Sequence, residues 1–419
     1  MLVGLLSSGC NLNFGAGPTP PLGKIQHVVV IMQENRSFDN LFYGFPGADT
    51  ATSGMDQGTS IALQPIPMGP GQDLDHTHPG WWKDWDDGRL DNFNHGQNFT
   101  IPNYPYSYVQ QSDIEPYWTL ARNYTLGDRM FQSNTGPSYV AHQYMIAGQS
   151  GDADENPDSQ WYWGCDAPPG TTVEMIGPNG TDLPGVFPCF DYQTMADLLD
   201  AKGITWRYYA TNYASTPKPE FIGYIWSAYD AIRHIRYGPD WTSDVISPDT
   251  QVLTDIQNGQ LAQVTWITPM EPYSDHPDSI LKDEGPDWVA SITNAIGASQ
   301  FWDSTVIFIS WDDWGGWYDH VRPPQVDNMG LGFRVPVIVV SPYAKHGYVT
   351  HVTHEFGSFL KYTEEVFNLP SLGTRDAIAD DFRDCFDYTQ TPQPYTQIPV
   401  TFDSAYFTSH TFTEPPDAY

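Results

Sequence analysis

Two pairs of adjacent oxygen-bearing side chains, far apart in the chain, are the residues best suited to chemistry. They are Glu34 with Asn35 and Asp312 with Asp313. Carboxylate and amide oxygens bind hard divalent cations, and adjacent carboxylates repel one another unless a positive charge lies between them. The two pairs therefore predict a site for one divalent cation: Mg, Ca, Mn or Fe, or Zn if a histidine takes part. Taken alone, Glu34 and Asn35 would fit equally well in a surface turn before a helix that begins near Ser37.

The segments that must position these pairs have the composition of buried strands. Val28–Met32 is an unbroken apolar run, and Thr305–Ile309 is β-branched and aromatic, which is typical of parallel strands covered by helices on both faces. Open α/β sheets bind their ligands at the carboxyl ends of the strands. We therefore expect both pairs to meet at one edge of a mostly parallel sheet. The Gly315–Gly316 turn should then bring Asp319 and His320 back to the same place.

Five motifs occur in a fixed order over most of the chain. They are QENRSFDNLF, a GPS turn followed by a tyrosine-containing helix start, SDHP, WDDWGGWYDHVRPP and GFRVPVIVVSPYA. From about Lys24 to about Tyr388 the chain resembles the bacterial phosphoesterase family that contains phosphatidylcholine-type phospholipases C and a class of acid phosphatases. The resemblance implies an alkaline-phosphatase-like α/β fold. It also implies a metal-assisted hydrolase of phosphoric esters with a Ser or Thr nucleophile.

Ser138 is the expected nucleophile. Gly136 and Pro137 set a turn, and Ser138 opens a predicted helix that runs through Ile146, so its hydroxyl lies at the positive end of the helix dipole. An arbitrary serine at this position would more often be a simple N-cap. The family places its nucleophile directly after this Gly-Pro, which favours Ser138, with Thr135 as the second choice.

The residues after Ser138 differ from the phospholipase pattern. Where phospholipase-like members continue Pro-Asn-Arg, this chain has Val140, Ala141 and His142. The missing arginine leaves the substrate class open. We expect His142 to contact substrate in its place.

Two histidines before the GxxDxF segment are candidates for phosphate contact or proton transfer. The family has a histidine about a dozen residues before this segment, which here spans Gly88–Phe93. His76 fits that spacing and is the expected catalytic residue. His78 is the alternative and would otherwise contact substrate.

Further catalytic histidines come from two later motifs. His276, in SDHP, follows a predicted strand at Val264–Ile267, and Asp275 should orient it, contact the metal or contact substrate. His320 belongs to the WYDH motif. Together with His76, these imidazoles would bind phosphoryl oxygens and supply a proton to the departing alcohol.

The composition excludes several classes of partner. The chain has 51 Asp and Glu against 18 Lys and Arg, and a net charge of -33. Such a surface repels nucleic acid and anionic membranes. A small phosphate ester or a phospholipid headgroup is the expected partner. Nothing in the sequence predicts nucleic-acid binding or a stable protein partner.

The N-terminal segment resembles the end of a short apolar leader, but it lacks the basic start of a full signal peptide, so either the leader is trimmed or the segment is not one. Met1–Cys10 is short and apolar, and Asn11–Leu22 is rich in Gly and Pro, as in a linker. We expect residues 1–23 to be a leader remnant and linker and residues 24–419 to form a single catalytic domain. The protein would be secreted or periplasmic, with Cys10 as a possible lipid anchor.

The remaining cysteines predict one disulfide. Cys165 and Cys189 bracket a Pro/Gly-rich loop that would gain order from a disulfide bond, although both would be reduced in a cytosolic protein. Cys385 is expected to be a buried free thiol. No CxxC pair or His/Cys cluster occurs in the sequence, so a zinc site with a thiolate ligand is not expected.

Other segments complete the predicted elements. Gly47–Asp73 should be a long loop over the active edge, Phe221–Tyr237 an aromatic helix, Val335–Val340 a buried strand and Thr353–Phe367 a helix. A helix ending at Gly203 should precede another strand.

The predicted function is hydrolysis of phosphoric esters of the acid-phosphatase type, with an acidic optimum because imidazolium is the useful form of the histidines. Phospholipase C activity on phosphatidylcholine-type diesters is the close alternative. A non-catalytic surface binding protein is a remote one. A glycosidase, suggested by the many tryptophans and carboxylates, would remain active without metal and without Ser138.

Overall fold

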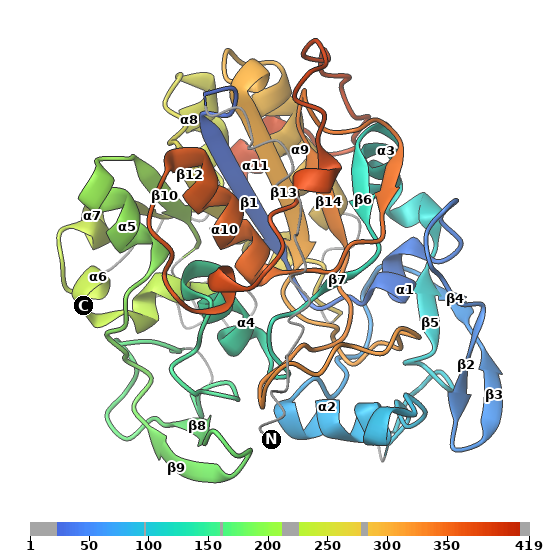
Figure 1. The fold of residues 1–419 in the computed structure, drawn as a ribbon. Coiled ribbons are helices and arrows are strands. Elements are labelled where there is room, and N and C mark those ends of the chain that lie inside the picture. Colours follow the sequence, from blue (N-terminus) through green and yellow to red (C-terminus); the bar gives the residue numbers. More distant parts are fainter. Residues whose placement is uncertain (1–22, 96–97, 160–161, 212–225, 278–283, 411–419) are drawn as a thin grey trace, which may run out of the picture.

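The computed structural model describes most of the chain (Figure 1). The described residues are 23–95, 98–159, 162–211, 226–277 and 284–410. The segment with Cys10 lies outside them. Within these ranges, no helix has the length and apolar character needed to cross a membrane.

An eight-stranded sheet forms the centre of the fold, in the order β11-β10-β12-β1-β13-β14-β6-β15. Every neighbouring pair is parallel except those of β14, which runs antiparallel to β13 and β6. The strands are β1 His27–Gln33, β6 Thr125–Gly127, β10 Trp206–Tyr209, β11 Val245–Ile246, β12 Val264–Ile267, β13 Thr305–Trp311, β14 Val337–Val340 and β15 Tyr348–Thr350. The predicted mostly parallel α/β sheet is confirmed.

Helices cover both faces of this sheet. The helices are α1 Phe38–Phe42, α2 His78–Trp85, α3 Glu115–Asn123, α4 Ser138–Ala147, α5 Met195–Lys202, α6 Arg233–Arg236, α7 Asp240–Ser243, α8 Gln251–Gln257, α9 Glu284–Gly297, α10 Phe356–Phe367 and α11 Ser404–Ser409. Figure 1 shows α10 in front of β1, with α9 and α11 behind the strands. Because no face is left to solvent, every residue of β13 and nearly every residue of β1 is buried.

Gly203 and Gly148 end two of these helices as C-caps. Both have positive φ, of 68° after α5 and 62° after α4, which glycine adopts without strain. The predicted glycine stop before β10 is therefore confirmed.

The region over the active edge contains more structure than the predicted loop. Within Gly47–Asp73 the chain forms the antiparallel hairpin β2 Ser53–Asp56 and β3 Thr59–Ala62, and then β4 Gln64–Ile66, which pairs with β5 Ser107–Val109. The expectation of a plain loop was wrong because these strands are short and their partners are not visible as a hydrophobic pattern. Figure 1 places the hairpin and α2 beyond the lower ends of the central strands.

Two predicted helices differ from the structure. The described part of Phe221–Tyr237 forms only a 3-10 turn at Ala228–Ala231 and the single turn α6. Helix α10 begins at Phe356 instead of Thr353, because His354–Glu355 is extended as β16 and pairs with β7, Met130–Phe131.

A disulfide bond joins Cys165 and Cys189. The intervening loop contains a second hairpin, β8 Val173–Ile176 with β9 Asp182–Val186. Cys385 is a buried free cysteine at the end of a 3-10 turn.

Candidate active site

The two oxygen-bearing pairs meet at the carboxyl ends of neighbouring strands. β1 and β13 pair in register up to Gln33 and Trp311, so the residues that follow them are adjacent. The backbone N–H of Asn35 donates to Asp312 Oδ1 at 2.9 Å, and Asn35 Nδ2 donates to Asp313 Oδ2 at 3.4 Å. The predicted approach of the two strand ends is therefore present in the structure.

A glycine makes this approach possible. Gly315 has a φ of 62°, and a Cβ atom added to it would lie 2.2 Å from the carbonyl oxygen of Asn35. Only glycine fits, because any larger residue would push the loop after Asp313 away from the end of β1. Asn35 itself has a φ of 58°, a conformation that asparagine tolerates better than most residues.

The three carboxylates of this cluster are completely buried, and they repel one another. Burial raises the pKa of Glu34 well above its usual value, and Asp312 and Asp313 raise it further. Burial and Asp312 likewise raise the pKa of Asp313. Asn35 Oδ1 and Asp312 Oδ2 are buried without a hydrogen-bond partner. Crowded carboxylates with unpartnered oxygens are the donor set that a divalent cation requires, so the residues present fit such a group.

Ser138 lies directly against this cluster. It is the first residue of α4, all ten of whose residues are buried, and its Oγ donates to Glu34 Oε2 at 3.1 Å. Its Oγ also lies 3.4 Å from Asp313 Oδ2. Gly136 allows the tight turn before the helix, because a Cβ there would lie 2.5 Å from the carbonyl oxygen of Asp154. The hydroxyl therefore lies between the carboxylates and the start of a buried helix.

His142, one turn further along α4, contacts the carboxylates and has almost no exposed surface. Its Nε2 lies 2.8 Å from Glu34 Oε1 and 3.9 Å from Asp312 Oδ2. Burial lowers the pKa of His142 to about 4, against the opposing effect of Asp312, so the ring is neutral at physiological pH. The structure thus places His142 behind Glu34 instead of at the expected substrate surface. It could hold Glu34 in position or serve as a nitrogen ligand.

His76 and His276 lie opposite each other, with ring centroids 5.9 Å apart. Both rings interact electrostatically with Asp313. Burial alone would lower the pKa of His76, but Asp313 and Asp73 raise it to about 9, so the ring is charged at neutral pH. His76 Nδ1 lies 2.8 Å from the carbonyl oxygen of Leu74, which leaves Nε2 for other contacts.

Sequence reasoning missed Asp73, which joins His76 and His276 in one group of potential ligands. Its Oδ1 lies 3.5 Å from His76 Nδ1 and 3.9 Å from His276 Nε2. An acidic residue three positions before His76 was the available signal.

His78 lies near this region but makes structural contacts. Trp82 Nε1 donates to His78 Nε2 at 3.1 Å, so the other nitrogen carries the proton and donates to Thr135 Oγ1 at 2.9 Å. Burial lowers the pKa of His78. The pair His78–Thr135 therefore fixes the loop before Ser138.

Asp275 also makes structural contacts. Tyr117 Oη and Trp311 Nε1 both donate to its Oδ2, at 2.9 and 2.8 Å. Burial raises the pKa of Asp275 to about 6. These contacts anchor the SDHP segment beneath His276 instead of orienting the imidazole of His276.

His320 belongs to a separate network. Its Nδ1 lies 2.6 Å from Asp39 Oδ2 and its Nε2 3.1 Å from Asp49 Oδ1, and buried Arg334 pairs with Asp319 at 2.8 Å. None of these contacts reaches Ser138 or the carboxylate cluster. Asp319 and His320, expected to return to the edge that carries the two oxygen-bearing pairs, instead form an ion-pair network that holds α1 to the loop after β13.

Most tryptophans of the active-edge loops are packing residues. Trp81, Trp314 and Trp317 are completely buried, whereas Trp82 is 47% exposed. The three buried rings belong to two hydrophobic clusters that include neighbouring aromatic side chains. A phospholipase C that acts on phosphatidylcholine would bind the choline group against exposed aromatic rings. Most of these rings are buried, so the structure gives little support to such a site.

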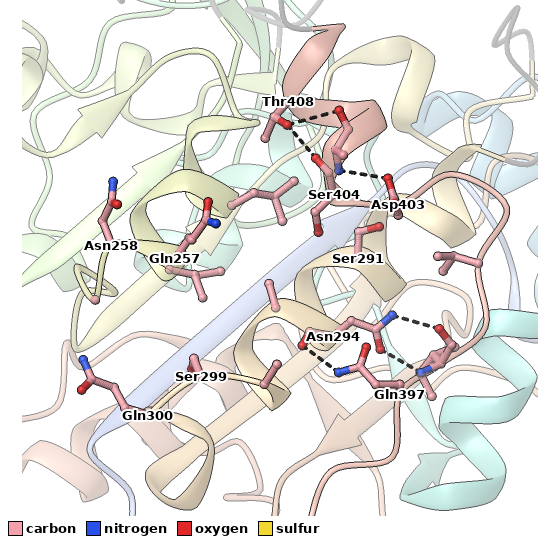
Figure 2. Close-up of a pocket in the computed structure, with 18 residues that line it drawn as sticks. Gln257, Asn258, Ser291, Asn294, Ser299, Gln300, Gln397, Asp403, Ser404 and Thr408 are labelled. Atoms are coloured by element: carbon pink, nitrogen blue, oxygen red, sulfur yellow. Dashed lines mark hydrogen bonds between the residues drawn. The ribbon is translucent and has the colours of Figure 1, made fainter.

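A cavity of about 980 Å³ lies between α8, α9 and the C-terminal segment (Figure 2). Figure 2 shows its polar lining, which is mostly amides and hydroxyls such as those of Gln257, Asn294 and Ser404. Among its described lining residues there is no His, Lys or Arg. It shares no residue with Ser138 and the carboxylates around it, and its described lining offers no positively charged side chain to a phosphate.

The His320 network predicts a pH-dependent stability. Burial lowers the pKa of His320, but the hydrogen bond and charge of Asp39 raise it to about 9, with Asp319 adding to and Arg334 opposing this effect. In the unfolded chain the pKa of a histidine is about 6.5, so folding favours the protonated form of His320. The stabilisation of the folded protein by His320 is therefore complete below about pH 6.5 and disappears as the pH rises through 9.

We therefore expect His320→Gln to lower the thermal unfolding midpoint at pH 6 and to leave it nearly unchanged at pH 10. Calorimetry over this range, with exposed His346→Gln as control, measures the difference. Equal destabilisation at both pH values would contradict an ionic role for His320.

Comparison with known proteins identifies the family of this chain. Residues 25–370 match the Phosphoesterase family. Phospholipase C B of Mycobacterium tuberculosis is 26% identical over 91% of this chain and 81% of its own length. Non-hemolytic phospholipase C of Pseudomonas aeruginosa is 25% identical over 91% of this chain and 60% of its own length. Non-specific phospholipase C6 of Arabidopsis thaliana is 24% identical, with coverages of 90% and 74%.

Solved structures show a more distant likeness. A protein of the alkaline phosphatase superfamily from Vibrio parahaemolyticus has a TM-score of 0.40 at 10% identity, covering 88% of this chain and 75% of its own. Lipoteichoic acid synthase LtaP from Listeria monocytogenes has a TM-score of 0.41 at 8% identity, with coverages of 85% and 75%. Because the family match spans most of the 419 residues, the resemblance found in the motifs is confirmed: the chain belongs to the phosphoesterase family and is a hydrolase of phosphoric esters.

Proposed function

We propose that the enzyme hydrolyses phosphoric esters through a covalent phosphoseryl intermediate on Ser138. The observation that carries the proposal is the position of Ser138 Oγ, within 3.4 Å of both Glu34 and Asp313 at the start of buried α4. Pro137 is the N-cap residue of α4 and Ser138 is the first residue of the helix, so the Ser138 hydroxyl does not have the N-cap role that an arbitrary serine at this turn would more often take.

Glu34, Asn35, Asp312 and Asp313 would hold one divalent cation, with His142 supporting Glu34. When bound, the cation would favour the alkoxide form of Ser138 and offset charge on a phosphate oxygen. The start of α4 adds its partial positive charge, and Ser138 attacks phosphorus in line with the leaving alcohol. Water then hydrolyses the phosphoserine.

His76 and His276 are the proposed proton donors and phosphoryl contacts. His76, with a pKa of about 9, is charged at neutral pH and can donate from Nε2. His276 lies on the opposite side of the same space and interacts with Asp313. One ring can therefore protonate the leaving oxygen while the other binds a non-bridging oxygen.

The charges of the site favour a diester at neutral pH. Three carboxylates, one divalent cation and one imidazolium sum to about zero net charge. A phosphate monoester carries about 1.5 to 2 negative charges at pH 7, whereas a diester carries one. Among the described residues, no Lys or Arg forms an ion pair with the carboxylate cluster to bind the extra charge. The phospholipase C names of the relatives support the same substrate class.

A broad acid phosphatase is the second candidate. Val140, Ala141 and His142 replace the Pro-Asn-Arg of phospholipase-like members, and the net charge of -33 disfavours binding to anionic lipid. Acidic pH would remove the second charge of a monoester and so relieve its repulsion by this site. We also propose a secreted or periplasmic location, in keeping with the disulfide between Cys165 and Cys189.

Asp312→Ala should abolish turnover and the cation bound at the ends of β1 and β13, while preserving the fold. Asp312 lies after the end of β13, and its removal relieves repulsion of Glu34, so the cation-free stability should not fall greatly. Elemental analysis, turnover and circular dichroism measure these effects, with exposed Asp303→Ala as the control. A variant that kept the full metal content of the wild type and its activity would show that the catalytic cation binds elsewhere.

Ser138→Ala should lose on the order of 10⁴-fold or more in kcat while still binding vanadate, since the carboxylates and imidazoles remain. Trapping of phosphoenzyme from a labelled substrate should succeed only with the wild type. Thr135→Val is the matched control and should retain the intermediate. Near-normal turnover of the alanine variant would move the nucleophile to Thr135 or to water.

The substrate class can be tested with three chromogenic esters. At pH 7.5 we expect p-nitrophenylphosphorylcholine and bis-p-nitrophenyl phosphate to be cleaved faster than p-nitrophenyl phosphate, and the monoester rate to rise towards pH 5. Because the choline group has few exposed rings to contact, Trp82→Ala should change the two diester rates equally. Cleavage of the monoester alone at both pH values would overturn the diester assignment.

A further inference from the structure

A second group of potential metal ligands lies apart from Ser138 and the carboxylates of Glu34, Asp312 and Asp313. It combines His354 of β16 with Asp384 and Cys385 of the 3-10 turn Arg383–Cys385. One ligand atom from each residue lies within 4.8 Å of the others. His354 and Cys385 are completely buried. No member belongs to the candidate active site, and sequence reasoning missed the group because about 30 residues separate the histidine from the cysteine.

The orientation of His354 points to a ligand. Both ring nitrogens are buried without a hydrogen-bond partner although the ring is 0% exposed, and Nε2 lies 3.6 Å from Asp384 Oδ1. On the other side of the ring, Nδ1 lies 2.9 Å from Asp380 Oδ1. Metal-binding histidines are oriented in this way, with one nitrogen towards a carboxylate and the other towards the cation.

The distances between the three candidate ligand atoms are close to those of a tetrahedral metal site. Cys385 Sγ lies 3.7 Å from Asp384 Oδ1, and His354 Nε2 lies 3.6 Å from the same oxygen. Zinc bond lengths at a tetrahedral angle place nitrogen and oxygen about 3.4 Å apart and sulfur and oxygen about 3.5 Å apart. Thr350 Oγ1 donates a hydrogen bond to Asp384 Oδ2. This leaves Asp384 Oδ1 as the carboxylate oxygen that faces His354 and Cys385.

Solvent can reach the group through its two carboxylates. A thiolate is the form of cysteine that ligates metal, so Cys385 would bind a cation with loss of its proton. The side chains of Asp380 and Asp384 are 34% and 26% exposed, which provides a path from solvent.

We propose that His354 Nε2, Asp384 Oδ1 and Cys385 Sγ form a second cation site for a zinc-like transition metal, with Asp380 orienting the imidazole. The sulfur and nitrogen ligands disfavour Ca²⁺ and Mg²⁺, unlike the oxygen ligands at the ends of β1 and β13. Binding forms a metal–sulfur bond and releases the thiol proton of Cys385 to solvent. The fourth ligand position is left to water.

The expected role of this site is structural. β16 pairs with β7, the strand that leads into the segment before Ser138. Just after β16, the backbone N–H of Phe356 donates to Ser133 Oγ at 2.9 Å. A cation on His354 would therefore stabilise the edge from which the nucleophile loop begins.

Cobalt binding to the full-length protein tests the proposal, because a thiolate ligand gives cobalt a near-ultraviolet charge-transfer band that oxygen ligands do not. We expect this band in the wild type and in Asp312→Ala, whose active-edge site is disabled. Cys385→Ser should lose the band and one equivalent of bound zinc while retaining turnover. His354→Gln should weaken cobalt binding at least 10-fold.

Cys10→Ser is the matched control, because Cys10 is the other cysteine outside the disulfide, and it should keep the band. A second measurement uses only the wild-type protein and so does not depend on whether a variant folds. Zinc should slow the modification of Cys385 by a thiol reagent, and removal of zinc with a chelator should restore the rate of modification. A wild type without the band, or a band that persists in Cys385→Ser, would show that Cys385 is only a buried free thiol beside a His–Asp pair.

Discussion

The crowding of three buried carboxylates at the ends of β1 and β13 is the constraint on which the rest of this structure depends. Glu34, Asp312 and Asp313 are fully removed from solvent, and burial and mutual repulsion raise the pKa values of Glu34 and Asp313. Such an arrangement costs folding free energy unless protons or a cation offset the charge. A divalent cation bound between these carboxylates would offset this repulsion, which would favour its binding.

The surrounding elements keep the carboxylates together despite this repulsion. The parallel register of β1 with β13 brings the two strand ends side by side. Gly315 lets the following loop pass against Asn35. Beyond the loop, buried Arg334 pairs with Asp319 at 2.8 Å and with Asp39 of α1 at 3.4 Å, so these ion pairs hold the loop after β13 to α1. His320 contributes to this anchor, so a histidine adjacent to a catalytic motif serves the scaffold.

The parts that the sequence could predict were those set by local pattern. A buried apolar strand followed by paired acids predicted the position of Asp312 and its approach to Glu34, and the turn before Ser138 predicted the start of α4. The role of His142 could not be predicted, because its contact with Glu34 depends on how α4 packs against β1. Asp275 was misplaced for the same reason: its partners Tyr117 and Trp311 come from distant elements.

The His354–Cys385 group was missed for the same reason, because its members come from distant parts of the chain. A cation site of this kind also matters for the folding of so acidic a chain. A net charge of -33 places many carboxylates near one another, and self-repulsion opposes the compact state. A cation that binds only the folded chain shifts the folding equilibrium towards it. With a cation bound, the oxygen cluster beside Ser138 and the sulfur-containing group at β16 would each stabilise the fold in this way, at two separate places. Their different donor atoms would favour different classes of cation, so an ion at the oxygen cluster could exchange without loss of an ion at the other group.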